Sequence, residues 1–295
     1  MTDLLIKHVR CPACRASVAR ETAAALRCTG CDRTYPIVHG VPWMASGNGV
    51  AARNARSFGF QWRARARNLF ERGTLYGMSR EQERQHFLDA MGIGPQALTG
   101  RTVLDAGCGD GFLLTVLAQY PAAVFGIDIN TAVRTPELGE ADPGAVTVLQ
   151  ADLFAPPFAP ATFDFVWCEG VLVHTADPRS GFRTLTELVK PGGRLYVWVY
   201  PSERRSVYQR LRDLLPVAHR VPWPLLLVLC YILAIPLAVA KRESFRTVAF
   251  ALFDNLSPPI QSRHTAAEVR GWFEEHGFSD LKQTGLVGMS GTKAR

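Results

Sequence analysis

Four cysteines near the start of the chain have the spacing of a metal site. Cys11 and Cys14 form one CxxC pair, and Cys28 and Cys31 form a second pair after thirteen intervening residues. Each pair presents two thiolates from one tight turn, and four thiolates complete a tetrahedral zinc site with no open position for water. The spacing therefore predicts a structural zinc ion, with a redox or disulfide role as the alternative interpretation.

The residues that follow predict a small ribbon around this ion. Residues 35–42 have the pattern of a strand, a turn and a strand, and His39 is expected in the turn because four cysteines already fill the metal site. A segment of this size has too small a core to fold unaided, and a bound zinc ion supplies the missing folding free energy. We therefore expect residues 1–47 to form a zinc-ribbon domain.

A second group of chemically capable residues lies in the middle of the chain. Residues 103–111 read VLDAGCGDG, a glycine-rich turn after an apolar run that ends in Asp105. Glycines here let the backbone turn sharply and let a nucleoside lie against it without obstruction by Cβ atoms. Asp128 and Asp152 come at or just after the ends of the next two apolar runs. Asp128 is placed to accept hydrogen bonds from both ribose hydroxyls.

The elements that must position these residues alternate between short apolar runs and helical stretches. This alternation is typical of βαβ units and a parallel sheet. Right-handed crossovers place the loops after the strands at one edge of the sheet, where open α/β sheets bind ligands. The expected strands are residues 102–105, 123–128, 146–151, 163–168 and 194–200.

Residues 101–200 resemble a class I S-adenosylmethionine-dependent methyltransferase of the type 11-like group. The glycine-rich turn and five further motifs occur in family order: GID at 126–128, QAD at 150–152, FD at 163–164, GVLVH at 170–174 and KPGG at 190–193. The resemblance implies an α/β, Rossmann-like, doubly wound and mostly parallel sheet that binds S-adenosylmethionine.

The same resemblance implies a role for each donor-site residue. Asp105 and the backbone of 107–109 would lie along the methionine part, Asp128 would hold the ribose, and Asp152 with Leu153 would bracket the adenine. Cys168 would contact the methionine part through its backbone. The full set implied for donor binding is Asp105, Gly107, Cys108, Gly109, Asp128, Ile129, Asp152, Leu153 and Cys168.

Two residues after the fourth expected strand are candidate catalytic groups. The family often has two histidines here, and in this chain Val173 replaces the first while His174 remains. His174 is a candidate general base, with a hydrogen-bonded structural histidine as the alternative. Glu169 is a candidate carboxylate base, with a donor-binding or solvated role as the alternative. A base is required only if the acceptor must lose a proton.

Residues 48–100 are expected to be a helical connection rich in arginine and aromatic residues. Arginines interleaved with aromatic rings can stack bases and hold phosphates. The favoured interpretation is a helix that buries Phe58 and Trp62 on the next domain while its arginines, from Arg53 to Arg67, face water. A further helix is expected over residues 80–91.

An insert, residues 201–262, follows the fifth expected strand. Residues 221–240 carry no charge, and twenty apolar residues can span a bilayer. Pro222, Pro224 and Pro236 are expected to break the run and leave about eleven uninterrupted residues, too few to cross. The alternatives are an apolar lid or acceptor pocket, a membrane-surface hairpin, a dimer interface, and a membrane span.

The last segment, residues 263–295, is expected to complete the core. Residues 264–277 have the pattern of an amphipathic helix with Thr265 as its cap, and residues 281–289 that of a sixth strand. The seventh, antiparallel strand that the family has is barely supported by residues 290–295.

Composition and charge limit the classes of function. The chain has 295 residues with a net charge of +7 and 47% hydrophobic residues, which excludes disorder and collagen-like structure. Residues 101–200 hold six basic and eleven acidic residues, and an acidic centre suits a cationic small molecule such as a sulfonium. No secretory signal is expected after Met1, so the expected compartment is the cytoplasm, at the inner face of the membrane if the insert binds lipid.

These observations favour a methyltransferase that acts on a small-molecule or lipid-linked acceptor, mainly by positioning the reactants. The runner-up is a methyltransferase for ribosomal or transfer RNA, with the zinc ribbon and the arginines as its RNA-binding surface. The zinc ribbon is similar to the small proteins that activate tRNA and release-factor methyltransferases. A third interpretation is a scaffold that binds the donor without turnover.

Overall fold

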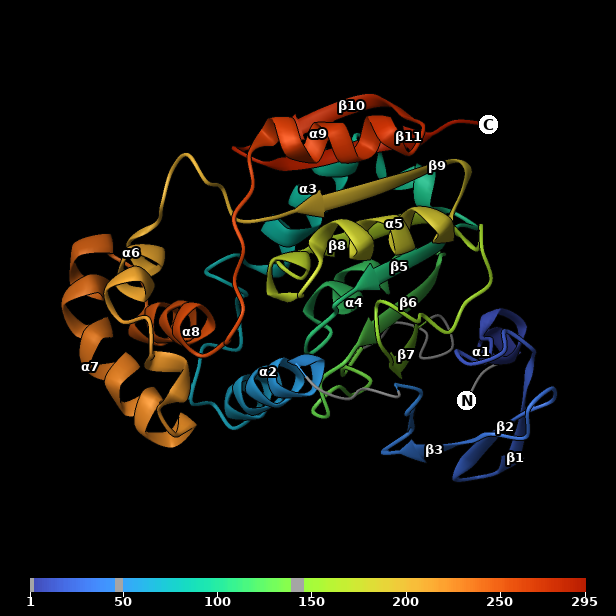
Figure 1. Cartoon of the computed structure of the whole chain (residues 1–295), viewed down its shortest axis with the longest axis horizontal. Helices are drawn as coiled ribbons and strands as arrows, with labels where there is room; N and C mark the ends of the chain where they lie inside the picture. Colours follow the sequence, from blue (N-terminus) through green and yellow to red (C-terminus); the bar gives the residue numbers. More distant parts are fainter. Residues whose placement is uncertain (1–2, 46–49, 139–145) are drawn as a thin grey trace.

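The computed structural model describes residues 3–45, 50–138 and 146–295. A seven-stranded sheet with the order β10-β11-β9-β8-β5-β6-β7 forms its centre (Figure 1). Neighbouring strands pair in parallel from β9 to β7, whereas β11 pairs antiparallel with both β9 and β10. The strands of the parallel part are β5 Thr102–Ala106, β6 Ala123–Asp128, β7 Val146–Gln150, β8 Phe163–Glu169 and β9 Val189–Trp198. The Rossmann-like sheet expected from the sequence is confirmed.

Helices cover both faces of this sheet, as the continuous apolar character of the parallel strands requires. Helices α3 (Arg80–Met91) and α4 (Phe112–Leu117) pack on one face, and α5 (Pro178–Leu188) and α9 (Ala266–Glu275) pack on the other (Figure 1). Because β5, β6 and β8 are parallel, the glycine-rich turn after β5 lies at the edge of the sheet where β6 and β8 also end.

The prediction for the last strands is wrong in its boundaries and in its doubt about the seventh strand. Strand β10 is Phe278–Thr284, and β11 is Gly288–Lys293, so a turn interrupts the expected strand over residues 281–289. The sequence of β11 is polar because large neighbours leave little room for side chains. A Cβ atom on Gly288 would lie 2.7 Å from Tyr196 Oη, and one on Gly291 would lie 2.9 Å from Phe273 Cδ1.

The N-terminal segment is a four-stranded antiparallel sheet that is docked on the large one. It begins with α1 (Asp3–His8), and its strands are β1 Val18–Thr22, β2 Ala25–Cys28, β3 Thr34–Val38 and β4 Val41–Pro42. The turn between β3 and β4 holds His39 and Gly40, both with positive φ, which confirms the turn assigned to His39. The chain then pairs with the edge of β7 through a bridge between Trp43 and Gln150.

The insert folds as a helical layer at the end of the molecule opposite this ribbon (Figure 1). It consists of α6 (Val207–Leu214), α7 (Trp223–Lys241) and α8 (Phe245–Leu256). The expectation that prolines break residues 221–240 is wrong. Pro224 lies in the first turn of α7, where no hydrogen bond is lost, and Pro236 is accommodated inside a continuous helix of 19 residues. Within the described residues, α7 is the one helix long and apolar enough to cross a membrane.

Helix α2 (Val50–Ala66) connects the ribbon to the core, and its environment corrects one expectation. Phe58 and Trp62, which were expected to be buried, are only partly buried, as is Phe60, which stacks on Phe253 of α8. Arg65, which was expected to face water with the other arginines, is only 3% exposed. Arg56 and Arg67 are exposed, and the side chain of Arg53 lies outside the described residues. Helix α2 therefore packs on the insert and on the edge of the sheet that carries the glycine-rich turn.

Candidate functional site

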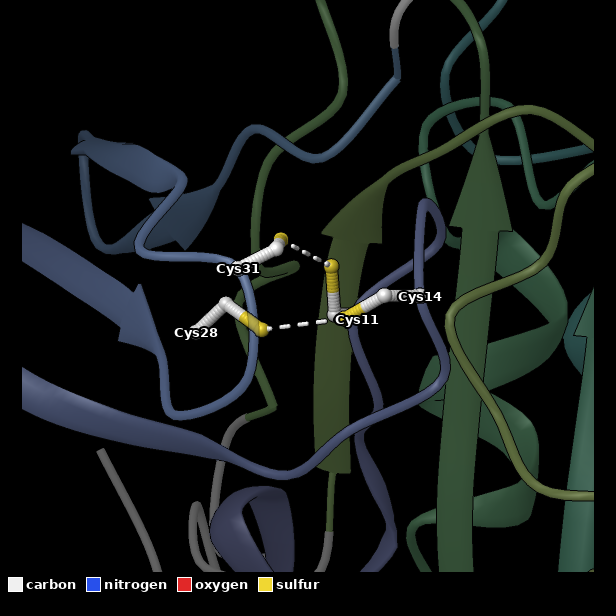
Figure 2. A group of neighbouring side chains, drawn as sticks. All are labelled: Cys11, Cys14, Cys28 and Cys31. Carbon is white, nitrogen blue, oxygen red and sulfur yellow. Dashed lines mark hydrogen bonds between the residues drawn. The ribbon is translucent and has the colours of Figure 1, made fainter.

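The four cysteines of the ribbon form a compact sulfur cluster (Figure 2). Their four Sγ atoms all lie within 4.8 Å of one another, and the Sγ atoms are 3.7 Å apart in the Cys11–Cys31 pair and 3.4 Å apart in the Cys14–Cys28 pair. Tetrahedral zinc with Zn–S bonds of about 2.3 Å requires sulfurs roughly 3.8 Å apart. The donor set therefore fits a structural zinc ion, and the four sulfurs would fill its coordination sphere.

The ribbon is joined to the donor edge through one glutamine. Gln150 at the end of β7 accepts hydrogen bonds at its backbone oxygen from the amides of Met44 and Ala45, at 2.7 and 3.1 Å. Its side-chain Nε2 donates to the Ile129 carbonyl at 2.7 Å. The ribbon thus holds the backbone at a residue between two predicted donor-binding positions, Ile129 and Asp152.

The glycine-rich turn has a backbone that requires glycine at two of the predicted positions. Gly107 has φ +98° and Gly109 has φ +58°, both in the left-handed region. A Cβ atom on Gly107 would lie 2.1 Å from Val171 Cγ2, and one on Gly109 would lie 2.5 Å from Trp62 Cζ2. The turn is therefore a close-fitting cradle that admits no side chain at Gly107 or Gly109.

Asp128 fixes this turn from the neighbouring strand. Its carboxylate accepts hydrogen bonds from the Gly109 amide at 2.8 Å and from the Asn130 amide at 2.9 Å. Burial raises the pKa of Asp128 despite these bonds. The carboxylate stands at the end of β6 beside the turn, where a ligand's hydroxyl groups can reach it.

A large cavity of about 850 Å³ opens along this edge of the sheet. Seven of the nine predicted donor-binding residues line it: Asp105, Gly107, Cys108, Asp128, Ile129, Asp152 and Leu153. The other two, Gly109 and Cys168, do not. The Trp62 ring covers Gly109, and the Cys168 side chain is fully buried in the core.

The donor half of the cavity is rich in buried carboxyl groups. Burial raises the pKa of Asp105 well above its ordinary value, and the charges of Glu83 and Asp128 act in the same direction. Glu83 of α3 is 2% exposed, and its Oε2 atom has no hydrogen-bond partner among the described residues. Burial together with the charge of Glu169 raises the pKa of Glu83 to about 7. A bound cation would relieve this repulsion, so the site fits the sulfonium and amino groups of S-adenosylmethionine.

Arg65 of α2 clamps the glycine-rich turn, a role that the sequence analysis missed. Its guanidinium forms an ion pair with Asp110 of the turn. It also donates to the carbonyls of Glu71 at 2.7 Å, Arg72 at 3.1 Å and Thr74 at 2.8 Å. The ring of Phe112 lies 5.4 Å away. An arginine in a basic run looks like any solvated arginine, so no local signal separated it from its neighbours.

We expect Arg65→Ala to lower the free energy of unfolding by about 3 kcal/mol or more, because it leaves Asp110 without its cation and three carbonyls without a donor. The variant also frees the glycine-rich turn, so donor affinity should fall. Denaturant unfolding and calorimetric titration of S-adenosylmethionine measure the two effects. Arg67→Ala, an exposed arginine of the same run, is the matched control, and equal stability of the two variants would contradict the clamp.

The acceptor half of the cavity has mostly aromatic and apolar walls. They come from α2, from the loop before α3, from the end of β9 and the residues just after it, and from α8. The wall residues are Phe58, Leu75, Tyr76, Met78, Trp198, Tyr200 and Ala251. This composition suits an apolar or aromatic acceptor.

Glu169, one of the two predicted catalytic residues, projects into this cavity beside a histidine that the sequence analysis missed. His86 Nε2 of α3 lies 3.2 Å from Glu169 Oε1. This hydrogen bond raises the pKa of His86 above its ordinary value, and the negative charges of Glu83 and Asp89 add to the effect. The two residues form a carboxylate–imidazole pair across 83 positions of sequence.

His174, the other predicted catalytic residue, also lines the cavity. Its Nδ1 atom is 3.0 Å from the Ile260 carbonyl, which accepts a hydrogen bond, so Nδ1 carries the proton and Nε2 is the free acceptor. The ring packs against Phe58 and Tyr200, with centroids 4.9 and 5.6 Å away. Burial lowers the pKa of His174, which keeps the ring neutral.

A third polar group in the cavity is Asp254 of α8. It is 4% exposed and accepts hydrogen bonds from Gln61 at 3.0 Å, Tyr76 at 2.9 Å and Tyr200 at 3.0 Å. These bonds tie the insert to α2, to the loop before α3 and to the segment that follows β9, so the acceptor half of the cavity is assembled from segments far apart in the sequence.

The parallel sheet, the glycine cradle and the carboxylates at the strand ends define a class I S-adenosylmethionine-dependent methyltransferase domain. Residues 104–197 match the model of the family described as "Methyltransferase domain".

Similar proteins extend this assignment. The chain is 37% identical over 115 residues to a ubiquinone biosynthesis O-methyltransferase of Paracidovorax citrulli, covering 38% of this chain and 46% of that one. It is 40% identical over 104 residues to the enzyme of the same name from Pseudomonas paraeruginosa, covering 34% of this chain and 44% of that one. The chain thus spans less than half the length of these curated relatives.

A solved structure of similar fold is magnesium protoporphyrin IX methyltransferase from Synechocystis PCC 6803 with bound S-adenosylmethionine. It shares 19% identity and a TM-score of 0.49, covering 84% of this chain and 99% of that one.

Proposed function

We propose that this protein transfers a methyl group from S-adenosylmethionine to an oxygen atom of a small-molecule or lipid-linked acceptor with an apolar or aromatic body. The observation that carries this proposal is one continuous cavity. It joins the glycine cradle and its carboxylates to a half with aromatic walls that contains Glu169, His86 and His174. The relatives named as O-methyltransferases support an oxygen atom as the acceptor.

Most of the catalysis would come from alignment. S-adenosylmethionine supplies an electrophilic methyl group on a positively charged sulfur. Gly107 and Asp128 would hold the donor at the end of the sheet, and Asp105 and Glu83 would favour its positive charge over a neutral molecule. Trp62 and Phe58 of α2 would exclude water from the methyl group, which leaves the acceptor oxygen as the available nucleophile.

Glu169 and His86 would remove the proton from the acceptor hydroxyl. With His86 neutral, the pair carries one negative charge, and Glu169 can accept the proton while the acceptor oxygen forms its bond to the methyl group and the sulfur–methyl bond breaks, which leaves neutral S-adenosylhomocysteine. With His86 protonated, the pair has no net charge and is a much weaker base. His174, held neutral with Nε2 free, would orient the acceptor.

We expect methyl transfer to fall as the pH is lowered through the raised pKa of His86, because only the neutral imidazole leaves the pair basic. Glu169→Gln should lower kcat about 100-fold, within the range for general base catalysis. It should also move the remaining acid limb to lower pH, since His86 loses the hydrogen bond that raises its pKa. Profiles of kcat against pH, measured with a stopped assay, give both the loss of kcat and the shift of the acid limb.

Glu187→Gln, at an exposed carboxyl group on α5, is the control for this substitution. In both variants, donor affinity should stay within about twofold of the value for the natural protein, which is a change in binding free energy of less than about 0.5 kcal/mol. His174→Asn distinguishes the role of His174 from that of His86. Loss of an orienting residue should change KM more than it shifts the acid limb of the pH profile. An unchanged acid limb and kcat in Glu169→Gln would remove the pair from the mechanism.

The proposed activity is tested by transfer of radiolabelled methyl from S-adenosylmethionine into a fractionated host extract. Label in the organic or small aqueous fraction supports the proposal. Label that is sensitive to nuclease would instead establish an RNA acceptor. The buried Arg65 and the docked ribbon do not favour that outcome, because they withdraw part of the basic segment from any RNA surface. Donor binding with no transfer into any fraction would indicate a scaffold.

A further inference from the structure

The outer face of α7 is an exposed apolar stripe. Its members are Leu225, Val228, Ile232, Ile235 and Val239, which are 63%, 54%, 60%, 60% and 78% exposed. They recur every three or four residues, so they lie along one side of the helix. At 1.5 Å per residue, the stripe runs for roughly 21 Å. Among the described residues, ten of the fifteen exposed large hydrophobic side chains lie in the insert.

The opposite side of α7 is fixed to the protein. Leu226, Leu227, Cys230, Ala234 and Ala238 are buried and pack in one cluster with Val248, Leu252 and Phe253 of α8. Helix α8 in turn carries Asp254, which accepts hydrogen bonds from Gln61 of α2 and from Tyr200 after β9. A bilayer crossing would have to separate α7 from α8, so the contacts favour a helix that lies along a surface.

The charges around the stripe match an anionic surface. Arg220 precedes α7, and Arg242 and Arg246 follow it, all three exposed. No carboxylate of the described residues lies within 4.0 Å of these arginines. The insert as a whole has eight lysines and arginines against four acidic residues. Three of those acids are engaged: Asp213 and Glu243 are in ion pairs, and Asp254 is buried.

A second copy of the chain is a poorer match to the same face. Helices that pair through such a stripe normally carry charged residues beside it, which select the partner. Residues 223–240 have no charged side chain, and Pro236 is exposed next to the stripe. An uncharged apolar face with basic residues at both ends is instead the composition of a helix at a membrane interface.

The cavity described above reaches this end of the molecule. Its lining includes Lys241 at the end of α7, Tyr208 of α6, and Arg204 and Arg205 before α6. Lys241 Nζ is held beside Tyr208 Oη at 2.8 Å. The wall of the cavity at this end therefore includes the last residue of α7, the helix that carries the apolar stripe.

We propose that the α7 stripe docks on an anionic lipid bilayer, with α7 lying in the plane of the head groups, and that the acceptor enters the cavity from the bilayer. The docking proposal rests only on the exposed apolar stripe and on the charged residues around it. The entry of the acceptor rests on the proposed function. In Figure 1, α7 is the outermost helix on the side away from the ribbon, so the ribbon would face the solvent.

Flotation of the full-length protein with vesicles tests the docking without any enzyme assay. The protein should bind vesicles of phosphatidylcholine mixed with phosphatidylglycerol, and binding should weaken in high salt and on vesicles of phosphatidylcholine alone. Ile232→Gln combined with Ile235→Gln should reduce binding about tenfold or more, because both side chains are exposed and have no packing role in the free protein. Ile6→Gln, at an exposed isoleucine of α1, is the matched control.

The outcomes separate docking from function. A protein that stays free of both kinds of vesicle overturns the docking, whether or not it transfers methyl groups. A stable dimer that the same double substitution dissociates would show that the stripe binds a second copy, and also overturns it. If docking holds, the double substitution should lower methylation of an acceptor in vesicles and leave methylation of a water-soluble acceptor unchanged. Equal loss with both acceptors would overturn entry from the bilayer.

Discussion

Replacing Gly107 with alanine is expected to lower the affinity for S-adenosylmethionine about 100-fold, or roughly 3 kcal/mol at 1.4 kcal/mol per tenfold. Two physical effects combine. Alanine in the left-handed region costs about 1–2 kcal/mol, and its Cβ would lie 2.1 Å from Val171 Cγ2. Val171 or the turn must move, and the donor cradle moves with them. Calorimetric titration with the donor measures the loss directly.

Gly100 provides the control for this substitution because it shares the backbone strain but lacks the clash. Its φ is +69°, and a Cβ atom there would have no neighbour within 4 Å. Gly100→Ala should therefore lower the melting temperature while leaving donor affinity nearly unchanged. Val171→Ala removes both Cγ atoms and should recover part of the stability of Gly107→Ala. Normal donor affinity in Gly107→Ala would show that the glycine turn is not the donor cradle.

Loss of the zinc ion that the four cysteines are predicted to bind is expected to have the second large effect, on the free energy of unfolding. Cys14 and Cys31 are exposed, so replacing either with serine changes one atom and removes no packing. Any loss of stability then reports on the metal. We expect a loss of several kcal/mol, since structural zinc contributes about 10–16 kcal/mol to the folding of isolated zinc-finger peptides. Metal analysis should find one zinc ion per chain in the natural protein and a large deficit in Cys14→Ser.

The same loss should reach the donor site through Gln150. When the ribbon loosens, the hydrogen bonds from Met44 and Ala45 to Gln150 are lost, and the contact of Gln150 with Ile129 is no longer held. Donor affinity should therefore fall in Cys14→Ser. In the natural protein it should fall when a chelator removes the zinc and return when zinc is added back. Arg33→Ala, an exposed substitution in the ribbon, is the control. Stability and zinc content unchanged by Cys14→Ser would contradict a structural zinc site.

The sequence by itself determined the features that depend on the spacing of residues near one another in the chain. The two CxxC pairs predicted a sulfur cluster, and the structure brings the four sulfurs within 4.8 Å of one another. The glycine-rich turn and the acidic strand ends predicted the donor edge, because parallel strands must end together at one edge of a sheet. The strands from β5 to β8 match their expected residues within one position for the same reason.

Other features were decided only by the tertiary structure, because they depend on which surfaces are covered. Arg65 differs from Arg67 in nothing that the sequence records, yet packing buries one and exposes the other. The pairing of His86 with Glu169 joins residues that no local pattern relates. Strand β11 has few apolar residues and still lies inside the sheet, between β10 and β9, because its glycines fit against large neighbours.

The insert illustrates the same limit. Its apolar residues favoured a lid or acceptor pocket and left an interface or a membrane contact open. Hydrophobicity sets the tendency of a side chain to leave water, whereas the neighbouring elements decide where it goes. Helix α8 covers one side of α7 and leaves the stripe of Leu225, Ile232 and Val239 exposed. Only the packed structure shows which apolar face still lacks a partner.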